Sequence, residues 1–422
     1  MNYHLHTKGF QNLTKVDDAL RIFFSALGEP SPKEERVPVH MTLGRHLARD
    51  IVAAVDLPQF DKAVMDGYAV RAADVNSASQ ESPVILQVKG ESRLGEVCRI
   101  HMGPGEAVAV ATGSMVPTGA DTIVIVERTR KLPGGRVAVH APASPGQSIA
   151  RKGEDVGAGT SVLKKGTRVR PQDAGILKTL GFSRVAVVQR PRIAILSTGD
   201  ELQDSMSKRT QGKIIDINRL ILSAMIRKQG ADPIDLGIAK DDDGQITACL
   251  KKGLKRSDAV LVTAGSSVGK RDLVPKCINR LGKPGVLVHG IAMRPAMPTG
   301  LAVVNGKAVL SLPGFPVSAI FGFRVFARPL FARLMGVPEE SEPTVKAVLK
   351  ERIVGSQGLR TFVRVVVERG GEGLVADPLK LQRASALMSL VAANGIVTIP
   401  EAVTEIEKGR TVDVVLVGQI PE

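Results

Sequence analysis

The pattern of hydrophobic and polar positions changes along the chain. The first pattern covers residues 1–190. A helical pattern comes first, at 16–28, with Thr14 as its N-cap and Gly28 as its end. Apolar runs with a β rhythm then alternate with Gly, Pro and Asp residues, which predicts strands and hairpins: EAVAVATG, ADTIVIVERT, GRVAVHAP and SRVAVVQ. A helix is predicted at 170–182. We therefore expect an extended, mostly β N-terminal region.

From residue 191 the pattern changes to alternating strands and helices. Three continuous apolar runs are typical of strands buried on both faces: RIAILST, PIDLGIA and DAVLVTAG. Helical patterns follow these strands: INRLILSAMIRKQG, GQITACLKKGLKRS and RDLVPKCINRLG. A hairpin with Asn305 and Gly306 at its turn comes next, and then a long helix at 316–336. Because strands alternate with helices, we expect residues 191–337 to form an α/β domain around a mostly parallel sheet.

The last part of the chain has a third pattern. A linker with prolines and glutamates at 337–343 precedes β runs alone, among them TFVRVVVE, NGIVTIPE and RTVDVVLVG. Residues 341–422 are therefore expected to form a small β-barrel or sandwich. The fold class predicted for the whole chain is α/β. We expect an elongated series of subdomains: an extended β subdomain at about 50–150, the central α/β domain and a C-terminal β-barrel.

The composition narrows the class of protein. The chain has 422 residues, a formal charge of +15 and three cysteines, Cys98, Cys249 and Cys277, without a C-x-x-C pair. Its apolar runs are shorter than the roughly 18 residues of a membrane helix, and its first residues lack a signal-peptide pattern, so we expect a cytoplasmic protein without membrane contact. The charge suits an anionic partner, or it only keeps the surface soluble. Aromatic residues are 3% and Trp is absent, which argues against a nucleic-acid partner.

Acidic residues gather at the ends of the three strands predicted for the parallel sheet. They are Asp200 and Glu201 after RIAILST, Asp241, Asp242 and Asp243 after PIDLGIA, and Asp272 after DAVLVTAG. Ligands of open parallel sheets bind at the carboxyl ends of strands, so we expect loops there to bring these carboxylates together. Converging carboxylates need a shared cation, and Mg²⁺ with ligand phosphates is the usual arrangement. The alternative for each residue is a helix N-cap or a solvated loop acid.

Two loops of the α/β domain have features of anion sites, and a third loop is a rigid turn. TAGSSVGKRD joins a strand to a helix, where Gly265 and Ser267 could hold an anion through backbone N–H groups and a hydroxyl; the alternative is a plain turn that needs glycine. In MRPAMP, prolines stiffen the chain around Arg294, whose guanidinium can clamp a phosphate or carboxylate. In LPGFP, Pro313 and Pro316 form a rigid turn, although Pro316 is also an ordinary first residue of a helix.

Several short strings occur in one order along the chain, and the ordered set identifies a family. They are PQFDKAVMDGYAVR, ATGSMVPTGAD, RKGEDV, ILSTGDEL, GIAKDD, AGSSVGKRD, LPGFPVSA, TFVRV and AANG. From about Val16 to Gly418 the chain resembles the molybdopterin molybdenumtransferase family, which includes the gephyrin E domain. The resemblance implies an enzyme of molybdenum cofactor biosynthesis. Such an enzyme inserts molybdate, or tungstate, into the dithiolene of adenylylated molybdopterin and releases AMP with the help of Mg²⁺.

The resemblance also implies an assembly and a set of site residues. It implies an elongated homodimer whose active site lies between the α/β subdomain of one chain and the extended β subdomain of the other. Contacts with other cofactor-biosynthesis proteins are a further implied partnership. The implied catalytic residues are Asp61, Glu201, Asp241 and Asp272, of which the last three hold the metal ion. The implied ligand contacts are Thr112, Gly265, Ser267, Arg294, Pro313, Pro316 and Ser389.

Some strings depart from the family pattern at residues that handle anions. The usual K-P-G-K-P reads RPAMP, so Arg294 replaces a lysine, Ala296 a glycine and Met297 a second lysine. The usual S-G-G-x-S-x-G reads TAGSSVG, and Arg360 of GLRTFVR is shifted by one place. Loss of one charge-assisted hydrogen bond costs about 1.5–3 kcal/mol, or roughly 10- to 100-fold in affinity. The alternative to an active enzyme is therefore a catalytically weakened paralogue that binds molybdopterin or acts as a scaffold.

Overall fold

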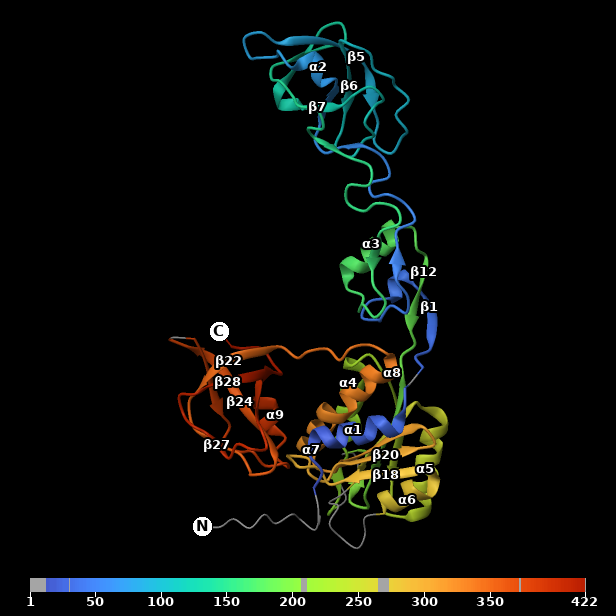
Figure 1. The fold of residues 1–422 in the computed structure, drawn as a ribbon, viewed down its shortest axis with the longest axis vertical. Coiled ribbons are helices and arrows are strands. Elements are labelled where there is room, and N and C mark those ends of the chain that lie inside the picture. Colours follow the sequence, from blue (N-terminus) through green and yellow to red (C-terminus); the bar gives the residue numbers. More distant parts are fainter. Residues whose placement is uncertain (1–12, 30, 206–210, 265–272, 372, 422) are drawn as a thin grey trace. The chain divides into compact units, whose positions relative to one another are not determined.

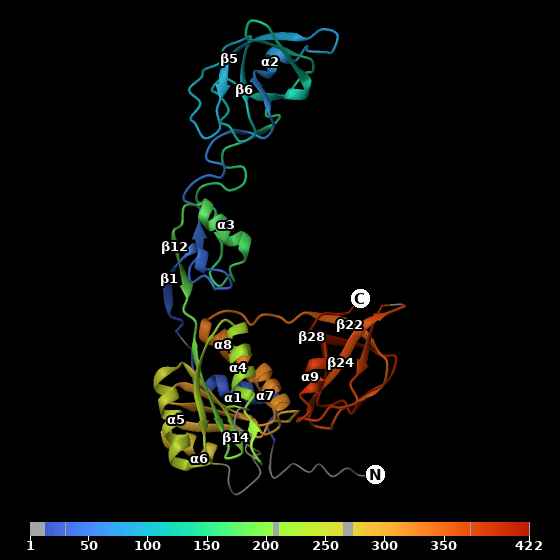
Figure 2. The same cartoon turned by 180° about the vertical axis from the view of Figure 1, so that it is seen from behind.

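The computed structural model describes residues 13–29, 31–205, 211–264, 273–371 and 373–421. The chain divides into two compact units, one of residues 36–187 and one formed by the chain before and after it. Figures 1 and 2 show the ribbon from opposite sides. In the part of the chain that the structure describes, no helix is both long enough and apolar enough to cross a bilayer.

A six-stranded sheet is the core of one half of the unit of residues 36–187. Its strand order is β7-β4-β6-β5-β9-β8, and β5 and β6 are its parallel pair. The elements are β4 (Gly67–Val70), α2 (Ala72–Val75), β5 (Val84–Ser92), β6 (Glu106–Val110), β7 (Thr122–Ile125), β8 (Thr129–Leu132) and β9 (Arg136–Val139). Alternate side chains of these strands enter two apolar clusters, one on each face. The strands predicted from EAVAVATG, ADTIVIVERT and GRVAVHAP are confirmed as β6, β7 and β9.

Short strand pairs and a helix form the other half of this unit. The pairs are β2 (Ile51–Val52) with β11 (Ser161–Leu163) and β1 (Glu34–Pro38) with β12 (Arg184–Val188). A third pair, β3 (Lys62–Ala63) with β10 (Ile149–Ala150), packs instead on the six-stranded sheet through Ala63 and Ile149. The helix predicted at 170–182 is confirmed as α3 (Pro171–Thr179), where Asp173 accepts a hydrogen bond from the Arg170 backbone N–H at 2.9 Å. Leu47, Leu177 and Val187 are fully buried in its apolar core.

A six-stranded sheet with helices on both faces organises the α/β part of the other unit. Its order is β16-β13-β17-β21-β20-β18; the first four strands are parallel, and β20 runs antiparallel to both its neighbours. The strands are β13 (Arg192–Thr198), β16 (Asp232–Ala239), β17 (Ala259–Ala264), β18 (Pro284–His289), β20 (Gly300–Val304) and β21 (Lys307–Pro313). Apolar side chains of β13 and β17 are buried on both faces, as their continuous apolar runs predict.

The helices of this part lie in two layers. On one face α5 (Asp243–Arg256) and α6 (Val274–Leu281) pack on each other and on the strands. The other layer contains α1 (Val16–Leu27), α4 (Asn218–Lys228) and α7 (Pro316–Gly322) (Figure 1). The chain continues from α7 through a π-helical turn, Phe323–Ala327, into α8 (Arg328–Met335).

A closed five-stranded β-barrel forms the C-terminal part, which confirms the predicted small barrel. The strands β24, β25, β22, β28 and β26 pair in this order, and β26 pairs with β24 to close it. The elements are β22 (Thr344–Leu349), β24 (Arg360–Gly370), β25 (Gly373–Pro378), α9 (Met388–Ala392), β26 (Gly395–Ile399) and β28 (Thr411–Leu416), with the pair β23 (Ile353–Val354) and β27 (Glu405–Ile406). The expectation of β runs alone is wrong, because α9 interrupts them.

Two other details of the predicted elements are wrong. Lys15, not Thr14, is the N-cap of α1, because its carbonyl accepts the first helical hydrogen bond, from the Ala19 N–H at 2.9 Å. The helix predicted at 316–336 has the right extent, but it widens at Phe323–Ala327. Pro329 follows this turn, and a proline lacks the N–H that continues the α-helical ladder. The Asn305-Gly306 hairpin turn is confirmed, with φ values of 50° and 78°.

Candidate functional site

The predicted acidic loops follow three strands that are neighbours in the sheet. β16, β13 and β17 lie side by side and parallel, so their carboxyl ends share one edge. The loops after β13 and β16 touch, because the Asp241 backbone N–H donates to Asp200 Oδ1 at 3.3 Å. The side chains of Glu201 and Asp241 are both exposed there. Asp272, Gly265 and Ser267 lie outside the described residues, and within the described ranges no three metal-ligating side chains gather.

Gly199 makes room for the carboxylate of Glu201. Its φ is 151°, and a Cβ placed on it would lie 2.6 Å from Glu201 Oε2 and 2.7 Å from Oε1. The carboxylate therefore lies against a backbone that only glycine leaves open. The close approach of the Glu201 carboxylate thus explains why a glycine precedes it by two residues in the string STGDEL.

A two-residue ladder fixes the backbone beside Glu201. β14 (Leu202–Gln203) pairs in parallel with β15 (Ile214–Ile215). The Ile214 N–H donates to the carbonyl of Glu201 at 2.8 Å, and Lys213 Nζ donates to the carbonyl of Asp200. Ile214 of β15 and Lys213, the residue before it, therefore hold two successive carbonyls of the acidic loop.

Asp242 is a helix N-cap, which is the alternative raised for it from the sequence, and Asp243 has side-chain partners of another kind. Asp242 Oδ1 accepts the Gln245 backbone N–H at 2.8 Å and so caps α5. Asp243 forms an ion pair with Arg280 and accepts a hydrogen bond from the Cys277 thiol at 3.1 Å. Of the acids after β16, Asp241 is therefore the one left for a ligand.

Arg294 lies on β19 (Met293–Arg294), which pairs in parallel with β24. Its guanidinium is exposed, and Nη1 donates to Ser356 Oγ at 3.4 Å. Two residues on, Ala296 is buried at a φ of 78°, in the left-handed region that favours glycine. The hydroxyl and the N–H of Thr299 donate to its carbonyl at 2.7 and 3.1 Å. The segment therefore keeps the turn with an alanine where the family pattern has glycine.

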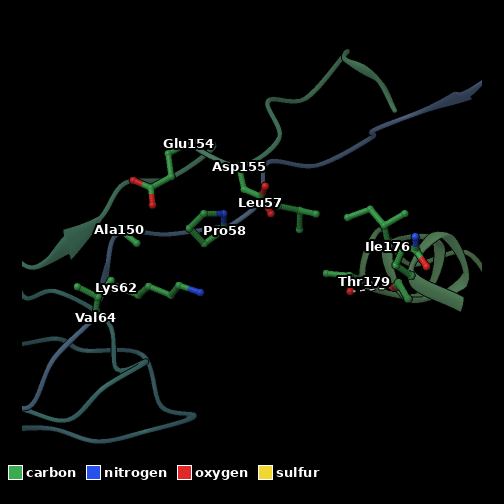
Figure 3. A pocket seen from close by; sticks show the side chains of 11 residues that line it. Leu57, Pro58, Lys62, Val64, Ala150, Glu154, Asp155, Ile176 and Thr179 are labelled. Atoms are coloured by element: carbon green, nitrogen blue, oxygen red, sulfur yellow. Dashed lines mark hydrogen bonds between the residues drawn. The ribbon is translucent and has the colours of Figure 1, made fainter. Parts of the chain in front are cut away.

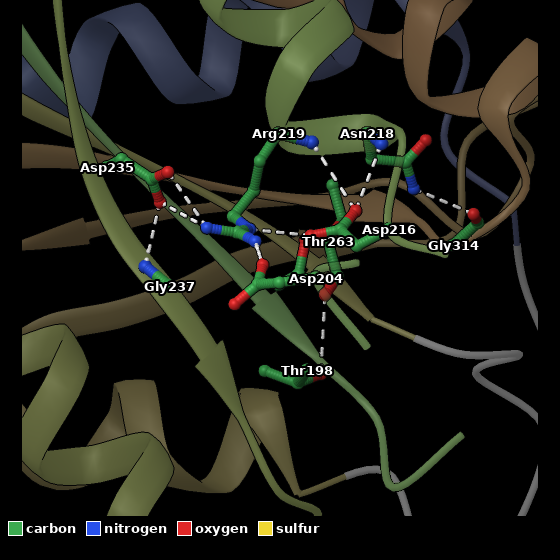
Figure 4. Close-up of polar contacts among 10 residues, drawn as sticks. Thr198, Asp204, Asp216, Asn218, Arg219, Asp235, Gly237, Thr263 and Gly314 are labelled. Carbon is green, nitrogen blue, oxygen red and sulfur yellow. Dashed lines mark hydrogen bonds and ion pairs between the residues drawn. The ribbon is translucent and has the colours of Figure 1, made fainter. Parts of the chain in front are cut away.

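The LPGFP turn joins β21 to α7. Pro313 is the last residue of β21, opposite Ala264 of β17, and Pro316 is the first residue of α7. Between them, the carbonyl of Gly314 accepts a hydrogen bond from Asn218 Nδ2 at 2.8 Å (Figure 4). The turn is therefore at the same sheet edge as the acidic loops and is tied to the start of α4.

Ser389 belongs to α9 and is 5% exposed. Its hydroxyl donates to the carbonyl of Ala386 at 2.6 Å. The hydroxyl hydrogen is thus used within the chain, and a ligand would contact the oxygen.

The sequence reasoning missed Arg364, a fully buried cation on β24. None of its three guanidinium nitrogens has a hydrogen-bond partner in the described parts of the chain, and burial lowers its pKa from the usual value. Phe362, on the same face of β24, packs on Phe321 of α7 with ring centroids 5.1 Å apart. An uncompensated buried charge is costly, so the site suits an anion. The signal was an arginine inside the apolar run TFVRVVV.

Asp61 and Thr112 lie in one group of loops in the unit of residues 36–187. The Val116 N–H donates to the carbonyl of Asp61 at 2.9 Å, and the Gly113 N–H to the carbonyl of Ala63 at 2.7 Å. These backbone bonds join the loop that contains Asp61 to the loop that contains Thr112. The structure therefore brings these two predicted residues together.

The carboxylates of this loop group accept hydrogen bonds that lower their pKa, and Thr112 is the one donor among them that the sequence reasoning singled out. Burial raises the pKa of Asp61, but hydrogen bonds from the Lys152 N–H at 2.8 Å and Arg151 Nη1 at 2.6 Å outweigh it and lower the pKa. The N–H and the hydroxyl of Thr112 donate to Asp66 Oδ1 at 2.7 and 2.8 Å and lower its pKa. Asp66 and Arg151 lie in the strings MDGYAV and RKGEDV.

A cavity of about 930 Å³ lies in the same unit. It is lined by Leu57, Pro58, Lys62, Val64, Ala150, Glu154, Asp155, Gln172, Gly175, Ile176 and Thr179 (Figure 3). Lys62 follows Asp61 directly, but the predicted site residues are not part of its lining. This cavity and the predicted site residues therefore do not coincide.

The chain matches known proteins along most of its length. Residues 14–181 match the family described as MoeA N-terminal region (domain I and II), residues 194–333 the probable molybdopterin binding domain, and residues 346–417 the MoeA C-terminal region (domain IV). The chain is 36% identical over 385 residues to molybdopterin molybdenumtransferase 2 of Mycobacterium tuberculosis, covering 90% of this chain and 94% of the relative. It is 34% identical over 409 residues to the molybdopterin molybdenumtransferase of Bacillus subtilis, covering 96% and 94%.

A solved structure has the same fold. The molybdopterin biosynthesis MoeA protein from Pyrococcus horikoshii superposes with a TM-score of 0.82 at 35% identity, covering 96% of this chain and 99% of that one. The fold and the matched family models define a multidomain α/β protein with a probable molybdopterin binding domain. The chain belongs to the molybdopterin molybdenumtransferase family, as the resemblance of its sequence strings implies.

Proposed function

We propose that this chain is an active molybdenum insertase, which takes adenylylated molybdopterin, inserts molybdate or tungstate into its dithiolene and releases AMP. The observation that carries this proposal is the pair of touching loops with the exposed carboxylates Glu201 and Asp241, at the carboxyl edge of neighbouring parallel strands. The names of the relatives, which are molybdopterin molybdenumtransferases, support it. We also propose cytoplasmic residence, as expected from the sequence.

The donor set at the sheet edge fits Mg²⁺. Glu201 and Asp241 offer carboxylate oxygens, the ligands that this ion prefers, and the predicted third ligand is Asp272. When bound, the ion supplies positive charge. This charge offsets the negative charge of the phosphate ester and of the AMP that is released. Gly199 leaves room for the Glu201 carboxylate, and the β14–β15 ladder fixes the Glu201 backbone through its carbonyl.

Cationic side chains handle the anionic reactants in this proposal. Arg294 is exposed on β19 and lies opposite Thr361 of β24. Arg364 is buried on β24, three residues after Thr361. A bound phosphate or carboxylate would give Arg364 the partner that the described chain does not provide. Fixed cations stabilise charge on a leaving group without reorganisation, and the chain's charge of +15 attracts anions at long range.

We propose a homodimer with a shared site, as the family resemblance implies. Asp61 and Thr112 lie in one unit, and Glu201 and Asp241 lie in the other. Hydrogen bonds from the Lys152 N–H and from Arg151 outweigh burial and lower the pKa of Asp61, so its part is that of a fixed negative charge. Contacts with other cofactor-biosynthesis proteins stay a prediction.

The test of the proposed function is molybdate-dependent AMP release from adenylylated molybdopterin. We expect release with Mg²⁺ and either molybdate or tungstate, and a loss of at least about 100-fold in Glu201→Gln and Asp241→Asn, because each removes one charge from the ion site. The matched control is Asp232→Asn, which removes a carboxylate at the far end of β16. Absence of release from the wild-type protein with saturating Mg²⁺ and either oxyanion would contradict the proposal.

A further inference from the structure

The first turn of α4 contacts two of the candidate ligand loops at once. Asn218 Nδ2 donates to the carbonyl of Gly314 in the LPGFP turn at 2.8 Å. The Asn218 backbone N–H donates to Asp216 Oδ1 at 3.0 Å, so its own position is fixed. The next residue, Arg219, reaches in the opposite direction, toward β16 and the acidic loop (Figure 4).

Arg219 gathers three carboxylates from three different segments. Its Nε donates to Asp216 at 2.6 Å, its Nη1 donates to both oxygens of Asp235 at 2.7 and 2.8 Å, and its Nη2 pairs with Asp204. The Arg219 side chain is 11% exposed and that of Asp216 is 1% exposed. A guanidinium is a rigid fork with donors in fixed directions, so three partners fix its plane. Removing it would leave the buried Asp216 carboxylate without a counter-charge.

The segments that Arg219 gathers continue into the loop of Glu201. Asp204 follows β14 and Asp216 follows β15, and the Asp216 N–H donates to the carbonyl of Gln203 at 3.0 Å. The other end of the same ladder is the bond from the Ile214 N–H to the carbonyl of Glu201. A two-stranded ladder this short is not stable by itself. Arg219 therefore closes one end of a ladder whose other end fixes Glu201.

We propose that Asn218 and Arg219 form a positioning brace, which sets the Glu201 loop and the LPGFP turn relative to each other for ligand binding. Asn218 positions the turn through the Gly314 carbonyl, and Arg219 positions Glu201 through the β14–β15 ladder. Neither side chain contacts substrate in this assignment. The inference rests on the proposed function for what the two loops bind, whereas the brace itself is a property of the chain.

The brace predicts a different defect for each of its two residues. In Arg219→Gln, the Mg²⁺ concentration for half-maximal AMP release rises about tenfold or more, as for partners that orient metal ligands, while the KM for adenylylated molybdopterin changes little. In Asn218→Ala, the KM rises and the Mg²⁺ dependence changes little. Arg219→Lys recovers part of the loss, because it keeps the charge but not the fork. The matched control is Arg333→Gln, an arginine of α8 that binds Glu29 and the carbonyl of Gly28.

Two measurements on the protein alone separate the brace from the proposed function. Hydrogen exchange of residues 211–217 is expected to speed up in Arg219→Gln at the amides of Ile214 and Asp216, and to stay at the wild-type rate in Arg333→Gln. Mn²⁺ affinity is expected to fall about tenfold in Arg219→Gln alone. Wild-type exchange and Mn²⁺ affinity in Arg219→Gln, or equal defects in Arg333→Gln, would overturn the brace. If the wild-type protein releases no AMP, the proposed function fails, and these two measurements still decide whether Arg219 positions the Glu201 loop.

Discussion

At the scale of single residues, the position of the Glu201 carboxylate depends on the absence of a side chain at Gly199. A Cβ atom on residue 199 would lie 2.6–2.8 Å from the two oxygens and the carbon of the Glu201 carboxyl group. We expect Gly199→Ala to displace this carboxylate and to lower Mn²⁺ affinity about tenfold or more. Titration of Mn²⁺ by calorimetry measures the effect directly.

The control for this substitution is Gly230→Ala. Gly230 also has a positive φ, 78°, but a Cβ on it would meet no atom within 4 Å. Both variants therefore include backbone strain of about 1–2 kcal/mol, and both should lower the melting temperature. Wild-type Mn²⁺ affinity in Gly199→Ala, or the same loss in Gly230→Ala, would show that the carboxylate does not depend on this glycine.

At the scale of elements, β24 contains an arginine at a position where an apolar side chain would suit the fold. Replacing a buried charge by an apolar residue of similar volume often stabilises by about 1–4 kcal/mol. We expect Arg364→Met to raise the melting temperature while it weakens binding of adenylylated molybdopterin about 10- to 100-fold, because one charge-assisted contact is lost. Differential scanning fluorimetry and ligand titration measure the two effects.

Arg369 on the same strand gives the matched comparison. Its side chain is exposed, so Arg369→Met should change the free energy of unfolding by no more than about 0.5 kcal/mol and leave binding unchanged. A less stable Arg364→Met with wild-type ligand affinity would mean that Arg364 is a structural residue.

Elements with a clear period were predictable, and the site was predictable only as far as it depends on them. Continuous apolar runs gave β13, β16 and β17, and their parallel order placed Glu201 and Asp241 on adjacent loops. Strands of two residues, such as β14 and β15, have no period, so the ladder that fixes Glu201 could not be found. Arg364 was missed because the apolar residues around it predict a strand and say nothing about the arginine itself. Its burial depends on packing against distant segments.

At the scale of the whole molecule, the proposed shared site makes a prediction about mixed dimers. We expect Asp61→Asn and Glu201→Gln to be inactive alone. After unfolding and refolding together, random pairing should restore about a quarter of the wild-type sites, because each mixed dimer then has one site with both residues intact. AMP release from the mixture measures this recovery.

Mixtures of each variant with wild-type protein provide the reference for refolding. A mixture of the two variants that stays inactive, while the references recover, would place Asp61 and Glu201 of one chain in the same site or show that the dimer does not form.

The central claim is that carboxylates at the carboxyl edge of the parallel sheet hold a divalent ion that lets two anionic reactants meet. Crystals of the protein with Mn²⁺ and AMP test it most directly, because Mn²⁺ is located by its anomalous scattering. The account predicts an ion about 2.0–2.3 Å from oxygens of Glu201 and Asp241, with a phosphate oxygen of AMP as a further ligand. Mn²⁺ and AMP bound elsewhere, with Glu201 and Asp241 both in solvent, would contradict it.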